Sequence, residues 1–122
     1  MDGKILQDVA RAQAQSLPDA KREQPFGPQA DVFKVHNKIF VLLVEEHGRP
    51  VVVLKSDPAD ATALREQYTD ITPGYHMNKE HWITLAPGDS INQQLVEDLV
   101  TNSYRLVVNE LPAADRPTGA EA

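Results

Sequence analysis

The sequence predicts a single α+β domain in which an antiparallel sheet is covered on one face by helices. Three short runs rich in β-branched and aromatic residues follow one another near the middle of the chain, with turn residues between them. Apolar residues at helical spacing flank these runs on both sides. A chain of 122 residues is long enough for one domain with one core. We therefore expect one domain whose second sheet face is open to solvent.

The N-terminal part of the chain predicts a helix followed by a loop. Residues 2–15 place apolar side chains at helical spacing, and the Leu-Pro-Asp sequence at 17–19 should end the helix. The residues expected to form its apolar stripe are Ile5, Leu6, Val9 and Ala12. Residues 17–30 contain three prolines and a glycine, which oppose regular structure and predict a loop.

The middle of the chain predicts a three-stranded meander. The expected strands are residues 31–35, 38–44 and 49–55. Only His36 and Asn37 separate the first two, and this suits a two-residue hairpin turn because Asn tolerates positive φ. Residues 45–48, which end in a glycine, should form the second turn.

The second half of the chain predicts a helix, a short strand and a longer helix. Asp57 can cap the first helix and Pro58 fits its first position. The residues that this helix should bury are Ala61, Leu64 and Tyr68. Residues 81–85 alternate as a strand, and in residues 90–108 a capping box of Ser90 and Gln93 precedes a broad apolar face. The domain should therefore span residues 1–108, followed by a disordered acidic tail at 109–122.

Composition excludes several classes of function. The chain has no cysteine, which removes disulfides, thiolate metal sites and cysteine nucleophiles. No apolar run approaches the roughly 18 residues of a membrane span, and the N-terminus does not resemble a secretory signal, so we expect a cytoplasmic protein that binds no membrane. The net charge of −6 opposes DNA binding by bulk electrostatics. Residues 31–56 carry four bases against three acids, so an anion-binding surface should come from this segment.

Residues 72–85 hold the densest group of polar and aromatic side chains. The group consists of Tyr75, His76, Asn78, Lys79, His81 and Trp82. The two histidines are five positions apart, which does not place them on one helix face, and we expect no metal site. No nucleophile elbow or phosphate-binding glycine loop is present, so we expect neither an enzyme nor a cofactor. Ser103 is expected to hydrogen-bond within or next to its own helix.

Two interpretations of this segment remain open from the residues alone. In the first, lysine and backbone amides bind phosphates, Asn78 reads a base edge, and aromatic rings stack on sugar or base. In the second, Pro73 and Gly74 form a turn, Met77 and Trp82 fill the core, and the polar side chains satisfy loop backbone.

The sequence PGYHMNKEHW at 73–82 resembles the signature of the MmcQ/YjbR family. Three further blocks resemble the family in the same order, and the likeness covers residues 4–108. They include Pro25-Phe26-Gly27, Phe33-Lys34-Val35, Lys38-Ile39-Phe40, Leu54-Lys55 and Ser103-Tyr104. The resemblance implies a CyaY-like or YjbR-like fold and DNA binding through a "double wing" of β-hairpins. On this interpretation the DNA-binding residues are Lys34, Lys38, Lys55, Tyr75, His76, Asn78, Lys79 and His81.

Other functions compete with DNA binding. Glu80 follows Lys79 where family members commonly carry a base, and its charge would repel phosphate. The alternative is a domain that binds a protein or a small ligand with the same surface and does not bind nucleic acid. A hydrolase or iron-handling function follows only from analogy with the frataxin-like fold. We expect a monomer without cofactor whose partner is DNA or, in the alternative, an unidentified ligand or protein.

Overall fold

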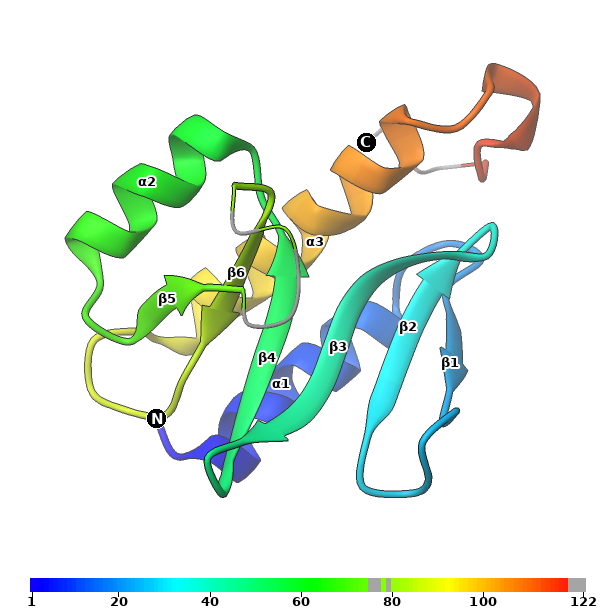
Figure 1. Cartoon of the computed structure of the whole chain (residues 1–122). Helices are drawn as coiled ribbons and strands as arrows, with labels where there is room; N and C mark the ends of the chain where they lie inside the picture. The colour runs from blue at the N-terminus through cyan, green and yellow to red at the C-terminus, as the bar shows by residue number, and fades with distance from the viewer. Residues whose placement is uncertain (75–77, 79, 119–122) are drawn as a thin grey trace.

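The computed structural model describes residues 1–74, 78 and 80–118. In this part of the chain six strands form one antiparallel sheet in the order β1-β2-β3-β4-β6-β5 (Figure 1). The strands are β1 (Lys21–Glu23), β2 (Asp31–Val35), β3 (Lys38–Glu46), β4 (Arg49–Lys55), β5 (Ile71–Pro73) and β6 (Trp82–Leu85). The helices are α1 (Gly3–Gln15), α2 (Pro58–Gln67) and α3 (Gln93–Asn109), with a 3₁₀ turn η1 (Ala113–Asp115). The predicted α+β class is confirmed.

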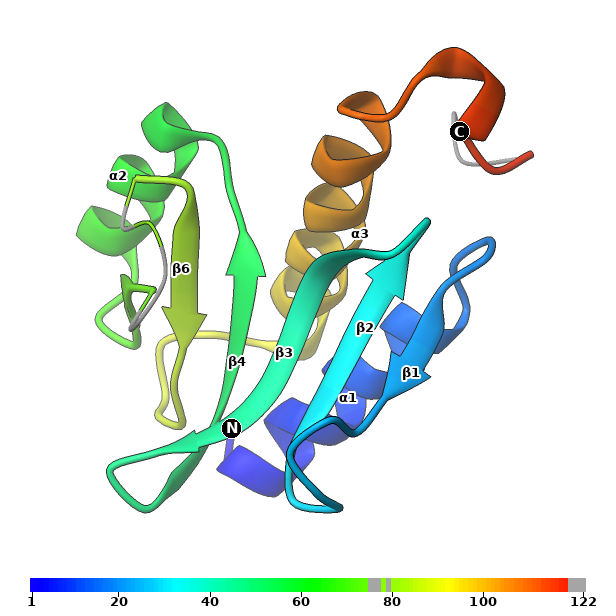
Figure 2. The ribbon, with the colours of Figure 1, turned by 45° about the vertical axis from the view of Figure 1, so that its right-hand side comes forward.

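Helices α1 and α3 cover one face of the sheet (Figure 2), and α2 lies beside its β5 edge (Figure 1). The main core fills the space between this face and the two covering helices. Its largest buried side chains are Tyr104, Phe33, Phe40, Leu6, Leu43, Leu54, Ile83 and Leu85. Among the residues that the structure describes, no helix covers the opposite face of β3, β4 and β6, and this face carries a second, smaller apolar cluster.

The stripe that α1 buries differs from the predicted one. The buried residues are Gly3, Leu6, Ala10 and Ala14, whereas Ile5 is 51% exposed. Helix α1 contacts both β4 and α3, so the small alanines fit where two neighbours meet. Of the predicted stripe, Leu6 is buried and Val9 packs against the core, whereas Ile5 and Ala12 are exposed.

The helix starts are set by local hydrogen bonds. Asp57 caps α2, as predicted, and its carboxylate accepts from the backbone N–H of Ala59. The predicted cap of α3 is wrong, because Asn92 accepts from Leu95 N–H and is the N-cap. Ser90 instead exchanges hydrogen bonds with Asp70, at 2.7 Å between the hydroxyl and the carboxylate.

Both predicted hairpin turns are present. His36 and Asn37 have φ values of 46° and 65°, the left-handed pair that a type I′ turn requires. His47 and Gly48, with φ of 52° and 76°, repeat this geometry between β3 and β4. The meander of β2, β3 and β4 therefore follows directly from the turn residues.

Two short strands were not predicted. Strand β1 lies in the segment expected to be a loop, and all three of its side chains are exposed. Strand β5 has one buried residue, Ile71. Neither strand shows an apolar alternation, and both are held by pairing with a neighbouring strand.

The segment expected to be a disordered tail differs in its first part. Leu111 is buried after the end of α3, η1 follows it, and Pro117 is buried as well. The Arg116 side chain donates hydrogen bonds of 3.2 Å to the carbonyls of Leu111 and Asn109. Residues 119–122 lie outside the described residues. Among the residues described, no helix is both long and apolar enough to cross a membrane.

Candidate functional site

Strand β3 is apolar on both of its faces, and a β-bulge interrupts its pairing with β2. The pairing with β2 shifts between Phe33 and Lys34, so that Phe40 is an extra residue on β3. As a result Phe40 and its neighbour Val41 are both buried in the main core. The alternate positions Leu42 and Val44 then face the open side of the sheet. A single strand thus contributes to the core and to the uncovered face.

The uncovered face is hollowed into a groove of ≈ 890 Å³, which we call the open-face groove. Its residues come from β2, β3, β4, the β1–β2 loop and the β3–β4 turn. They are Pro25, Phe26, Val32, Lys34, Ile39, Leu42, Val44, Glu45, Glu46, His47 and Val53. Val32, Leu42 and Val53 are cross-strand partners and form one apolar row across the three strands. The groove therefore has an apolar floor with its charged groups toward the ends.

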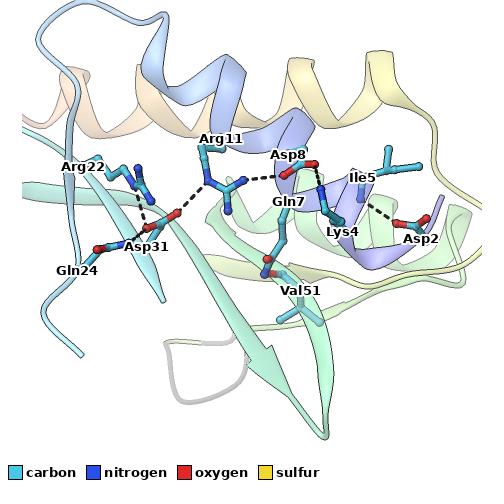
Figure 3. Close-up of polar contacts among 10 residues, drawn as sticks. All are labelled: Asp2, Lys4, Ile5, Gln7, Asp8, Arg11, Arg22, Gln24, Asp31 and Val51. Carbon is cyan, nitrogen blue, oxygen red and sulfur yellow. Dashed lines mark hydrogen bonds and ion pairs between the residues drawn. The ribbon is translucent and has the colours of Figure 1, made fainter. Parts of the chain in front are cut away.

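The β1–β2 loop forms one wall of the groove. Phe26 is 71% exposed, which is unusual for so large an apolar side chain. The base of this loop is fastened by Asp31, which is 4% exposed and accepts hydrogen bonds of 2.9 Å from Arg11, Arg22 and Gln24 (Figure 3). Three segments, α1, β1 and the loop, therefore converge on one carboxylate.

The hydrogen bonds to Asp31 decide its charge. Burial is the largest single effect and would raise the pKa, but the donors Gln24, Arg11 and Arg22 together outweigh it and lower the pKa of this carboxyl. Asp31 is thus ionised at neutral pH, and its charge is compensated by two guanidinium groups. Sequence reasoning missed this network because its members come from three separate segments.

The lysines predicted to bind DNA are mostly engaged with acids. Lys34 lies in the groove and pairs with Glu23 at 3.1 Å. Lys55 pairs with Glu110 at the end of α3. Lys38 is exposed at the start of β3. The three lysines lie toward the same end of the sheet, but two of them have carboxylate partners.

The tip of the predicted first wing is also close to an acid. His36 Nε2 lies 3.4 Å from Asp115 Oδ2, and both residues line a small polar hollow of ≈ 250 Å³. The hollow also contains Asp19 and Lys21, so its charges are mixed. This arrangement gives phosphate no concentrated positive surface.

The described part of the family signature is held by its own backbone. Asn78 Oδ1 accepts from Glu80 N–H at 3.0 Å, and the Asn78 carbonyl accepts from His81 and Trp82. The His81 carbonyl accepts from Ser56 N–H at 2.8 Å, which ties this turn to the end of β4. These contacts match the structural interpretation of the segment. Tyr75, His76, Met77 and Lys79 lie outside the described residues.

The structural interpretation of the segment places Trp82 in the core, but Trp82 does not pack in the main core. It packs against the cluster on the uncovered face, beside Leu42, Val44 and Val53. Gly74 is required next to it, because a Cβ added there would lie 2.6 Å from the Trp82 Cβ. The single tryptophan of the chain is therefore close to the residues that line the open-face groove.

The strands β3 and β4 separate beyond the pair Val41 and Leu54, and α3 bridges the gap. The buried hydroxyl of Ser103 accepts from Lys55 N–H at 2.8 Å and donates to the Phe40 carbonyl at 2.6 Å. Ser103 therefore bonds the backbone of two strands that lie next to its helix. Within the described residues no three His, Asp or Glu side chains are arranged to hold a metal ion.

The fold and the groove together define a class of small α+β proteins with helices on one sheet face and an apolar groove on the other. The family described as YjbR matches residues 15–106, and the chain belongs to this family. The predicted resemblance is therefore confirmed.

Named relatives and solved structures agree with this assignment. "Uncharacterized protein YbdF" of Escherichia coli O157:H7 is 44% identical over 116 residues, which cover 95% of each chain. "Uncharacterized protein YjbR" of Escherichia coli K12 is 38% identical over 88 residues, 72% of this chain and 75% of that protein. The crystal structure of Deinococcus radiodurans protein DR2400, a DUF419 domain, is 30% identical with a TM-score of 0.79, covering 89% of this chain and 83% of that one. A crystal structure from Pseudomonas syringae has a TM-score of 0.67 at 29% identity, over 87% and 98% of the two chains.

Proposed function

We propose that the protein is a non-enzymatic binding module that takes a small apolar ligand in the open-face groove. The observation that carries this proposal is the apolar row Val32, Leu42 and Val53 along the groove, with an exposed Phe26 in its wall. Val32 and Val53 are buried, so the apolar surface left for a ligand is that of Phe26 and of the half-buried Leu42 and Val44. Contact between apolar surface and water is unfavourable, and a ligand that covers such surface gains roughly 25 cal/mol per Å² of apolar area removed from water. A sheet face without this purpose would carry polar side chains.

The dimensions of the groove suit a small molecule. Its volume of ≈ 890 Å³ lies within the range of about 300–1,000 Å³ that small-molecule sites usually have. The floor is held by strand pairing because it belongs to the three strands of the meander, and the wall is fixed at its base by Asp31. A mostly apolar site with few polar groups at its rim is the usual architecture of ligand pockets.

DNA binding is the second candidate. Lys38 supports it, because this lysine is exposed beside the β2–β3 turn, at the tip of a hairpin. The ion pairs of Lys34 and Lys55 oppose it, since a phosphate would have to displace Glu23 and Glu110. With a net charge of −6 over the chain, the electrostatic contribution that dominates non-specific DNA binding is weak.

A titration with neutral phenylbutanol tests the proposed function. We expect amide chemical-shift changes on the open faces of β2, β3 and β4, a change in Trp82 emission, and a dissociation constant on the order of a millimolar, typical of so small a ligand. The variant Leu42→Gln should bind about tenfold more weakly. Ile5→Gln is the matched control, because Ile5 is an equally aliphatic, exposed residue of α1.

A parallel titration with duplex DNA at low salt separates the two candidates. Binding that weakens steeply with salt and is lost in Lys38→Gln would support DNA as the ligand. Absence of phenylbutanol binding would contradict the proposed function. The apolar-ligand proposal predicts phenylbutanol shifts in the groove and no shift of the same residues with DNA.

A further inference from the structure

The charged groups of the open-face groove lie at opposite ends of its floor. Strand β3 runs the length of the groove, with Ile39 at one end and Glu46 at the other. Lys34 is the cross-strand partner of Ile39 and marks the first end. Glu45 lies next to Glu46 at the second end, where the β3–β4 turn begins.

The basic end of the groove is already neutralised. Lys34 is 3.1 Å from the carboxylate of Glu23, and its side chain is largely covered. An anionic ligand would have to compete with this carboxylate for the ammonium group. The basic end therefore offers little attraction to a negative ligand.

Among the described residues, the acidic end carries two carboxylates without an ion pair. Within the described part of the chain, Glu45 and Glu46 have no ion pair and no side-chain hydrogen bond. Arg49 is the cross-strand partner of Glu46, and it also helps to lower the pKa of the Asp70 carboxyl. The two glutamates therefore outnumber the one arginine that faces them. The groove as a whole is therefore an apolar floor with a net negative end.

We infer that the open-face groove selects organic cations, an inference that rests on the proposed function. The apolar body of the ligand would lie over Leu42 and Val44, and its ammonium or guanidinium group would lie at Glu45 and Glu46. Leu42, Val44 and Glu46 follow one another on the same face of β3, so the first and last are about 13 Å apart along the strand. A ring placed over Leu42 therefore needs a spacer of several methylene groups to bring its charge to the glutamates. Glu46 is half-buried and Glu45 is exposed, and a partly buried carboxylate beside apolar surface attracts a cation more strongly than a carboxylate in open water does.

Three probes with the same body and different end groups test the charge preference. They are phenylbutylamine, phenylbutanol and phenylbutyrate, each titrated against the whole chain by amide chemical shifts and Trp82 emission. We expect the amine to bind about three- to tenfold more tightly than the alcohol, and the carboxylate to bind most weakly. The shifts caused by the amine should extend to residues 45–48, whereas those caused by the alcohol should not.

Variants of the two glutamates assign the preference to this end of the groove. Both side chains lie partly in solvent, so the double variant Glu45→Gln/Glu46→Gln should fold. It should remove the preference for the amine over the alcohol. Glu66→Gln on α2 is the matched control, because it removes an exposed charge far from the groove and should leave the preference intact.

The outcomes separate this inference from the proposed function. The charge preference is overturned if phenylbutyrate binds as tightly as the amine, or if the amine keeps its advantage in the double variant. In either case, binding of the alcohol would still support the proposed function. If none of the three probes binds, both are overturned. A preference that Glu66→Gln also removes would reflect the net charge of the chain and would equally overturn the assignment to this site.

Discussion

The variant Ser103→Ala tests the bridge that α3 makes between the separated strands. Ser103 is 0% exposed, and its hydroxyl is bonded to Lys55 N–H and to the Phe40 carbonyl. Alanine keeps the Cβ and removes only the oxygen, so packing changes little. The two backbone groups are then left buried without their partner.

The size of the effect follows from these two bonds. Each buried group without a partner costs roughly 1–3 kcal/mol, so the pair costs about 3 kcal/mol. Alanine returns about 0.5 kcal/mol because it is the better helix former. We therefore expect the free energy of unfolding to fall by about 2.5 kcal/mol.

Urea unfolding measures this change directly. The midpoint should fall by roughly 1–2 M with an unchanged slope, and hydrogen exchange of the Lys55 amide should become much faster. Ser16→Ala is the control, because the Ser16 hydroxyl makes one exposed bond to the Gln13 carbonyl and its loss should cost less than about 0.5 kcal/mol. A loss below about 1 kcal/mol in Ser103→Ala would refute the reasoning, because it would show that the strands close or that water replaces the hydroxyl.

Three further variants test other features. Asp31→Asn should cost about 2 kcal/mol at neutral pH. Because folding lowers the pKa of Asp31, this carboxylate stabilises the fold above its unfolded-state pKa, and the stabilisation is lost as the pH falls through the folded-state pKa. The free energy of unfolding should therefore depend less on pH at the acid end in the variant. An unchanged acid dependence would contradict this. Gly74→Ala forces a Cβ against Trp82 and should cost about 1–3 kcal/mol with a shift in tryptophan emission, whereas an unaltered spectrum and stability would show that the turn adapts. Phe26→Ala should leave stability within about 0.5 kcal/mol but weaken phenylbutanol binding several-fold, and unchanged binding would remove Phe26 from the site.

Features that depend on neighbouring residues were predictable from the sequence. The turn at His36 and Asn37 and the cap at Asp57 involve contacts only a few positions apart, and both are confirmed. Strand β1 could not be predicted, because its exposed Lys-Arg-Glu sequence carries no apolar pattern. Pairing with β2 holds it in place, and that is a tertiary effect.

The candidate site was predicted less well than the fold. The ion pairs of Lys34 and Lys55 connect separate elements, so these lysines looked available in the sequence. One signal for the groove was present and was not used. Residues 39–44 are six consecutive apolar residues, which is typical of a strand that is apolar on both faces and not of one that alternates.

The two apolar faces of β3 also affect how the chain finds its pairing. In an ordinary half-buried strand, a slip of one residue would expose the core residues to water, and this penalty selects the correct alignment. In β3 the same slip exchanges one apolar face for the other, so hydrophobicity discriminates weakly between alignments. The correct alignment of β3 with its neighbours must then be selected by the two tight turns, the bulge at Phe40 and the hydrogen bonds of the Ser103 hydroxyl. Loss of any one of them should therefore favour misaligned, aggregation-prone chains before it changes the native architecture.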